Sequence, residues 1–235
     1  MPNNESLTEN IISSFDTWKF KREQPFNYEK LKEVIQTAVD NSKPIKFVTY
    51  WGKGNKNEAG EPEKQALAFL QEFFDRIRTL YSPGIELLIL LTDTHAELNG
   101  HSKDNAKMYF DSVRDLAQAQ GFKTTYLSEL VEYNKDQLIP LVESVNMGKE
   151  LFEILLNSAE KHYTTSNDYS AAANLYYLQN QLEKEKIAEK YPDYIFLTFN
   201  GSELNDLFPK TLPIFYMYST KKGTSVKPWF EDELN

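Results

Sequence analysis

Three side chains that could carry acid–base chemistry lie close together near the middle of the chain. Asp93, His95 and His101 follow directly after residues 85–91, an almost unbroken aliphatic run. An imidazole has a pKa of about 6.5, so it can accept and donate a proton near neutral pH, and a carboxylate can hold a substrate ammonium group. We therefore take all three as candidate catalytic residues. The alternative is that Asp93 caps the next segment and His95 is an ordinary loop histidine.

The aliphatic run before these residues is typical of a strand that is covered on both faces. Parallel sheets covered by helices place their ligand-binding groups at the carboxyl ends of the strands. A further buried strand is expected at about 194–199, and the candidate binding residue Asn200 follows it. We expect Asp93 and His95 to converge on one cleft with Lys53, which lies in the loop over residues 52–60.

The loop over residues 52–60 follows the first expected strand and contains three glycines together with Lys53, Asn55 and Lys56. This composition suits a backbone that approaches an anionic group closely, although the spacing is not that of a Walker or dinucleotide loop. A solvated turn would have the same composition. Its lysines are expected to be exposed, so Lys53→Ala should leave thermal stability nearly unchanged. Lys46, inside the strand, is either a solvent-facing edge residue or part of the site.

The order of helical and strand patterns predicts one α/β domain with a Rossmann-like, mainly parallel sheet and helices on both faces. The strands are expected at about 45–50, 86–92, 122–127, 194–199 and 213–218. Within the single domain of 1–235 we distinguish an N-terminal helical arm (1–42), a Rossmann-like half (43–133), a helical insertion before the last strands (134–190) and the C-terminal strands (191–235).

The helical insertion carries four tyrosines that could line a pocket for a flat substrate: Tyr163, Tyr169, Tyr176 and Tyr177. Tyrosine at helical spacing is more often ordinary core. The charged run over residues 183–190 is most simply a solvated helix face.

Composition excludes several classes of protein. The formal net charge is −9, which opposes a role that depends on neutralising nucleic-acid phosphates. The chain has no cysteine, so it can form neither a disulfide framework nor a Cys-ligated zinc site. Its first residues lack the pattern of a signal peptide, and no apolar run approaches the roughly 20 residues of a membrane span. We expect a soluble, cytoplasmic protein; the sequence does not determine its oligomeric state.

Several segments between residues 27 and 130 together resemble the pyoverdine and dityrosine biosynthesis family of isocyanide (isonitrile) synthases. They are Pro-Ile-Lys-Phe-Val at 44–48, the polar loop with Lys53 and Lys56, Tyr-Ser-Pro-Gly at 81–84, the strand ending in Asp93, and Tyr109 on the following helix. Ser82 replaces a proline of the family's turn, and Thr94 stands where the family has glycine. The resemblance implies conversion of an amino acid's α-amine to an isocyanide, with the added carbon drawn from ribulose 5-phosphate as a co-substrate. We expect no bound cofactor and no metal.

That chemistry needs a cationic cradle for a phosphate, a carboxylate for an ammonium group, and acid–base groups for dehydration. Lys53, Asn55 and Lys56 suit the phosphate. Asp93 suits the ammonium group, and His95 suits the proton transfers, with His101 as a substitute. Lys46, Tyr109 and Asn200 complete the expected substrate-binding set.

The partners implied are small molecules, an amino acid and a sugar phosphate, and neither nucleic acid nor a membrane. Three alternatives stay open. The chain could be another Rossmann-type transferase or synthase, such as one resembling the cyclodipeptide synthases. Asp93 and His95, with His101, could ligate zinc or iron in a hydrolase. The chain could also be a non-catalytic binding or effector protein that has kept the fold.

Overall fold

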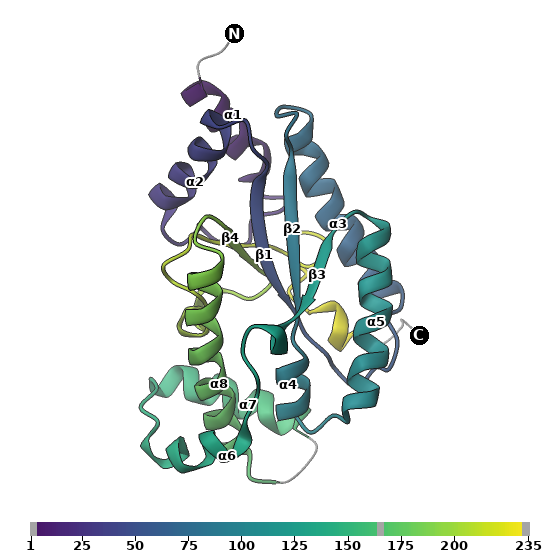
Figure 1. Ribbon diagram of the computed structural model, residues 1–235, viewed down its shortest axis with the longest axis vertical. Coiled ribbons are helices and arrows are strands. Elements are labelled where there is room, and N and C mark those ends of the chain that lie inside the picture. The colour runs from purple at the N-terminus through teal and green to yellow at the C-terminus, as the bar shows by residue number, and fades with distance from the viewer. Residues whose placement is uncertain (1–3, 164–166, 232–235) are drawn as a thin grey trace.

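A five-stranded parallel sheet forms the centre of the computed structural model, which describes residues 4–163 and 167–231 (Figure 1). Its spatial order is β3-β2-β1-β4-β5. The strands are β1 (Ile45–Trp51), β2 (Ile85–Leu91), β3 (Lys123–Tyr126), β4 (Ile195–Thr198) and β5 (Ile214–Tyr216). Every pairing between them is parallel, so the predicted α/β, Rossmann-like sheet is confirmed. The strand order reverses between β1 and β4, and a ligand crevice is expected at that point.

Helices lie on both faces of the sheet, as the sequence predicts. The helices are α1 (Asn4–Phe15), α2 (Tyr28–Asp40), α3 (Glu61–Arg78), α4 (Asp93–Leu98), α5 (Lys103–Ala119), α6 (Lys135–Leu138), α7 (Lys149–His162) and α8 (Tyr169–Lys190), with 3-10 turns η1 (Leu127–Glu129), η2 (Ile139–Ser144), η3 (Ser202–Leu207) and η4 (Pro228–Phe230). Helices α1, α2, α3 and α5 share one hydrophobic core, and α7 and α8 contribute to a second on the other face.

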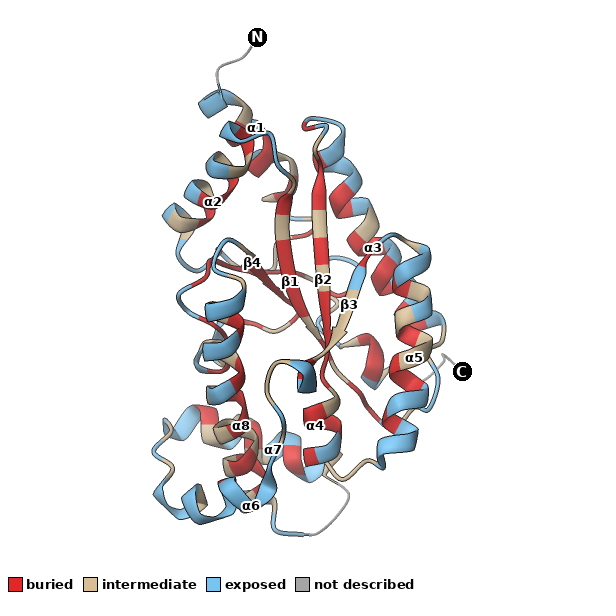
Figure 2. Cartoon of the chain, in the orientation of Figure 1, coloured by how far each residue is buried: buried red, intermediate tan, exposed pale blue. Residues whose placement is uncertain are grey.

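The two cores separate because successive strand side chains point to opposite faces. Phe47 and Trp51 of β1 face the first core, and Val48 faces the second. Figure 2 shows the central strands as almost continuously buried. Such double coverage explains why residues 85–91 read as an unbroken aliphatic run.

The N-terminal segment is more than a packing arm. Ile11, Ile12 and Phe15 of α1 are fully or almost fully buried in the first core. Beyond α1, Phe26 forms an antiparallel bridge with Ile214 of β5, so this segment also covers the outer edge of the sheet.

No helix in residues 4–163 and 167–231 is both long and apolar enough to cross a lipid bilayer.

Candidate functional site

A cavity of about 490 Å³ opens beyond the carboxyl ends of β1, β2 and β4. Strand ends and α4 form its base, α7 and α8 form one wall, and η3 and η4 close other sides. In Figure 1, α4 lies below the sheet, and it contacts α8. The cavity therefore lies where the reversal of strand order predicts a ligand site.

At the base of the cavity, His95 is paired with a buried glutamate. Its Nε2 lies 2.6 Å from Oε2 of Glu183, and the two side chains come from α4 and α8. His95 is 8% exposed and Glu183 is fully buried. The other oxygen of Glu183 accepts hydrogen bonds from Thr94 Oγ1 (2.7 Å) and Gln179 Nε2 (2.8 Å). Three partners thus compensate for the burial of this carboxylate.

Two tyrosines flank the imidazole of His95 and also line the cavity. The Tyr176 hydroxyl lies 3.5 Å from His95 Nδ1, and the two ring centroids are 4.9 Å apart. The Tyr50 hydroxyl is buried and has no hydrogen-bond partner within the described part of the chain. Burial, and then the charge of Glu183, raise the pKa of both tyrosines. Both hydroxyls therefore stay protonated near neutral pH and can donate to a ligand.

Two lysines, Lys53 and Lys227, also line the cavity and make part of its lining cationic, and the imidazole of His162 lines it as well. Lys53 is only 5% exposed, and its ammonium group donates to the carbonyl oxygens of Gly54 (3.0 Å) and Lys56. Burial lowers the pKa of Lys53 and of Lys227. The Lys227 ammonium group forms no hydrogen bond or ion pair with the residues that the structure describes, and the charged groups near it are Arg22 and Glu203. It can therefore serve an anionic ligand.

Of the predicted site residues, the structure brings His95, Lys53 and Asn200 to the cavity. Asn200 lies just after β4, where its backbone N–H donates to Thr198 Oγ1. Lys53 differs from the expectation of an exposed lysine, because its Nζ is enclosed by the carbonyls of its own loop.

Asp93 does not line the cavity, so the expected convergence of Asp93 with His95 and Lys53 does not occur. Its carboxylate accepts a hydrogen bond from the backbone N–H of Ser128 (3.0 Å) and another from the Ser128 hydroxyl. Asp93 and His95 are two residues apart at the start of α4, and side chains at that spacing do not share a helix face. Asp93 therefore ties α4 to η1.

Lys46 and Asn55 also lie away from the cavity lining. Lys46 is near the amino end of β1, opposite Glu86 of β2, with its Nζ 5.5 Å from the ring centroid of Tyr194. Asn55 is exposed on the loop.

Lys56 and Tyr109 do not line the cavity. Both contact a second buried glutamate, Glu63. Lys56 Nζ lies 3.1 Å from Glu63 Oε1 and also donates to the carbonyl oxygen of Pro228 (2.9 Å). The Tyr109 hydroxyl donates to Glu63 (3.0 Å). These contacts fix the loop over residues 52–60 against η4, so Lys56 has a structural partner rather than a free charge.

His101 lies apart from the His95 pair and is not among the cavity-lining residues. Burial, followed by the nearby charges of Lys53 and His162, lowers its pKa from 6.5 to about 4. His101 is therefore neutral near neutral pH. No group of three or more His, Cys, Asp or Glu residues in the described ranges is arranged to hold a metal ion.

Glu183 belongs to the charged run of residues 183–190, which the sequence predicts to be a solvated helix face, yet in the structure it is fully buried. A signal was present: Tyr176, Glu183 and Ile187 recur at spacings of seven and four along α8, which places them on one face of the helix. Lys227 and His162 were also missed, because nothing near them in the sequence marks a site.

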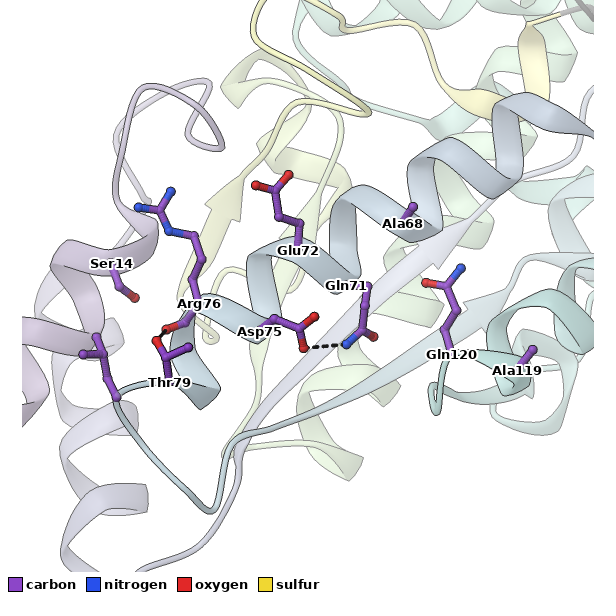
Figure 3. Close-up of a pocket in the computed structure, with 10 residues that line it drawn as sticks. Ser14, Ala68, Gln71, Glu72, Asp75, Arg76, Thr79, Ala119 and Gln120 are labelled. Carbon is purple, nitrogen blue, oxygen red and sulfur yellow. Dashed lines mark hydrogen bonds between the residues drawn. The ribbon is translucent and has the colours of Figure 1, made fainter.

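A second, more open hollow lies on the outer side of α3, toward the amino ends of the strands (Figure 3). Its charged side chains have partners on the surface: Glu72 pairs with Lys19, and Asp75 pairs with Arg78. Gln71 donates to Asp75, as the dashed line in Figure 3 shows. Among the residues that the structure describes, no histidine lines this second hollow, whereas His95 lines the cavity at the strand ends. The cavity at the strand ends is therefore the candidate site.

Fold and cavity together define a Rossmann-like α/β protein with a polar site at the carboxyl edge of its sheet. The structure is similar to the PvcA protein from Pseudomonas aeruginosa, with a TM-score of 0.69 and 15% sequence identity, over 95% of this chain and 87% of that one. The resemblance to the isocyanide synthase family is thereby confirmed at the level of fold.

Weaker similarity extends to two further structures. One is tyrosyl-tRNA synthetase complexed with L-tyrosine from Archaeoglobus fulgidus, with a TM-score of 0.49 and 14% identity, covering 89% of this chain and 63% of that one. The other is cyclo(L-leucyl-L-phenylalanyl) synthase, with a TM-score of 0.46 and 12% identity, covering 85% and 98%. No protein-family model and no curated protein matches the sequence.

Proposed function

We propose that this protein is an isocyanide synthase-like enzyme that converts the α-amine of an amino acid with a pentulose phosphate as carbon donor. The observation that carries the proposal is the combination of groups that line the cavity. Its lining holds a histidine–carboxylate pair and two lysines, at the strand-order reversal of a fold similar to PvcA. The lysines suit the phosphate of a phosphorylated carbonyl compound, and the histidine–carboxylate pair suits an amine that must lose a proton.

The two lysines suit the phosphate of the sugar. The Lys227 ammonium group forms no hydrogen bond or ion pair with the residues that the structure describes, and Lys53 keeps donor capacity, since only two carbonyls accept from its three N–H groups. Lys53 thus keeps the phosphate-binding role expected from the sequence, and Lys227 takes the place of Asn55 and Lys56. Asn200 also lines the cavity and can donate to a sugar hydroxyl or to the phosphate.

The pair of His95 and Glu183 suits the amine. In the first step that the chemistry requires, the amine nitrogen attacks the ketone carbon, and the adduct loses water to give an imine. His95 can take the proton that the ammonium group must lose and return a proton to the departing hydroxyl, so that one residue serves both transfers. The hydroxyls of Tyr50 and Tyr176 can donate hydrogen bonds to the ketone oxygen.

Part of the cavity lining near α7 and η3 is apolar and includes Leu155, Leu207 and Phe208. This part suits an apolar amino-acid side chain, since burying apolar surface contributes roughly 25 cal/mol per Å². Small-molecule substrates and a cytoplasmic location are parts of the same proposal.

A mass-spectrometric screen of the purified protein with pooled amino acids and pentulose phosphates tests the proposal. We expect an isocyanide product with at least one pair and none with the His95→Gln variant, whose side-chain amide can still donate to Glu183. If no pair gives an isocyanide, the proposed activity is wrong and a binding role becomes the better account of the cavity.

A further inference from the structure

The two carboxylate oxygens of Glu183 have different partners. Oε1 accepts from Thr94 Oγ1 at 2.7 Å and from Gln179 Nε2 at 2.8 Å. Oε2 lies 2.6 Å from His95 Nε2. Because Glu183 is fully buried, water cannot take over either set of hydrogen bonds.

This arrangement determines which nitrogen of His95 carries a proton. An ionised carboxylate can only accept hydrogen bonds, so the Nε2 that faces it must be the donor. In a neutral imidazole the other nitrogen is then unprotonated. That nitrogen, Nδ1, lies 3.5 Å from the Tyr176 hydroxyl, and both residues line the cavity.

We propose that Glu183 is a positioning residue that holds His95 in the tautomer with its proton on Nε2, so that Nδ1 is the basic atom beside Tyr176 at the cavity. As a role in catalysis this rests on the proposed function, whereas the tautomer itself does not depend on any reaction. Among the described residues, the titratable groups that face the imidazole are Glu183, Tyr50 and Tyr176.

The substitution Glu183→Gln should reverse the tautomer. Thr94 and Gln179 both donate to the Oε1 position, and the variant keeps both hydrogen bonds when its carbonyl oxygen occupies that position. Its amide NH₂ group then occupies the position of Oε2 and donates toward His95 Nε2. His95 must accept there, and its proton moves to Nδ1. In the variant, Nδ1 of His95 would be a hydrogen-bond donor at the cavity and no longer a base. Glutamine and glutamate have almost the same shape, so the cavity itself would hardly change.

Thr94→Val provides the matched control. It removes one of the two donors to Oε1 but leaves the carboxylate and its contact with His95 Nε2 in place. Since Glu183 still only accepts hydrogen bonds, the tautomer of His95 should not change.

The test is nitrogen-15 NMR of the ligand-free protein over a pH titration, which distinguishes protonated from unprotonated ring nitrogens. The chain has only three histidines, and the His95 signals are those that disappear in the His95→Gln variant. We expect Nε2 to remain protonated throughout in the wild type and in Thr94→Val, with the titrating proton on Nδ1. We expect the opposite assignment in Glu183→Gln.

An unprotonated Nε2 in the neutral wild-type imidazole would overturn the proposal, and so would a Glu183→Gln spectrum that keeps the wild-type assignment. The wild-type spectrum is decisive even if the variant does not fold. Where the proposed reaction is observed, Glu183→Gln should lower kcat by about 100- to 10,000-fold with little change in KM. If the wild type gives no isocyanide, the proposed function fails, while the NMR result still decides the tautomer.

Discussion

Lys53 shows how the surroundings of one side chain change its expected behaviour. From the sequence it is a lysine in a glycine-rich loop, and such lysines are usually exposed. In the structure its ammonium group is enclosed by two carbonyl oxygens and lies 5.4 Å from the ring centroid of Tyr109. The charge therefore has both a local structural role and a position at the cavity.

Replacing Lys53 with alanine should destabilise the protein, in contrast to the expectation from sequence. The change leaves two loop carbonyls without their donor, which costs about 1–3 kcal/mol when such groups are buried. Urea denaturation of Lys53→Ala should show this loss. Asn55→Ala, at an exposed position in the same loop, should stay within about 0.5 kcal/mol of the wild type. Equal stability of the two variants would show that Lys53 is solvated.

The sequence predicted His95 because a polar cluster that directly follows a buried strand has its position set by the chain itself. It could not predict that Glu183 would contact His95, because the two residues are 88 positions apart and meet only when α8 packs beside α4. Asp93 was placed in the cleft incorrectly for a related reason. The turn into α4 decides which of two neighbouring polar side chains faces inward, and strand-end position alone does not.

At the scale of elements, η4 is held over the cavity by the loop at residues 52–60. Trp229 packs against Trp51 with ring centroids 5.6 Å apart, and Phe230 stacks on His162 of α7 at 4.0 Å. Gly54 lies so close to this turn that an added Cβ would be 2.2 Å from the carbonyl oxygen of Trp229. Only glycine fits there without moving the backbone of one segment.

Gly54→Ala should therefore displace η4 and expose Trp229 to solvent. Acrylamide quenching in a Trp18→Phe background removes the signal of the exposed Trp18 and leaves Trp51 and Trp229, both buried in the native protein. We expect quenching to rise in Gly54→Ala. Gly148→Ala is the matched control, because a Cβ there meets nothing within 4 Å. Unchanged quenching in both variants would mean that η4 is not held by this contact.

Strand and helix positions were largely predictable because local patterns determine them. The aliphatic run of β2 and the helical spacing of α3 are examples. The 3-10 turns that close the cavity, η3 and η4, were not predictable. Such turns have no periodic pattern, and their positions depend on contacts such as that between Lys56 and Pro228, which are 172 residues apart.

For the whole molecule, His101 links stability to pH. Its folded-state pKa of about 4 lies below the 6.5 expected for an unfolded chain, because burial and nearby positive charge disfavour the imidazolium. Between those two pH values the unfolded state binds more protons than the folded state. The contribution of His101 to the free energy of unfolding is therefore fully present above pH 6.5 and is lost as the pH falls toward about 4. Burial, followed by the charges of Lys161 and Lys227, also lowers the pKa of His162, which acts in the same direction.

His101→Gln should remove part of this pH dependence. Free energies of unfolding measured from pH 7 to pH 5 should fall less steeply in the variant than in the wild type. Since His101 is only partly buried, solvent screening makes the difference smaller than the pKa shift alone implies. Parallel slopes for the two proteins would show that His101 is not the group responsible.

The cavity brings together groups from β1, α4, α7, α8 and the C-terminal segment, and we propose that it transfers carbon from a sugar phosphate to an amine. The most direct test is to supply uniformly carbon-13-labelled ribulose 5-phosphate with an amino acid and to measure label in the product by mass spectrometry. The wild type should give an isocyanide with one labelled carbon. Asp93→Ala should do the same, and His95→Gln should give none. Absence of labelled product with every amino acid, or undiminished label with His95→Gln, would contradict the claim.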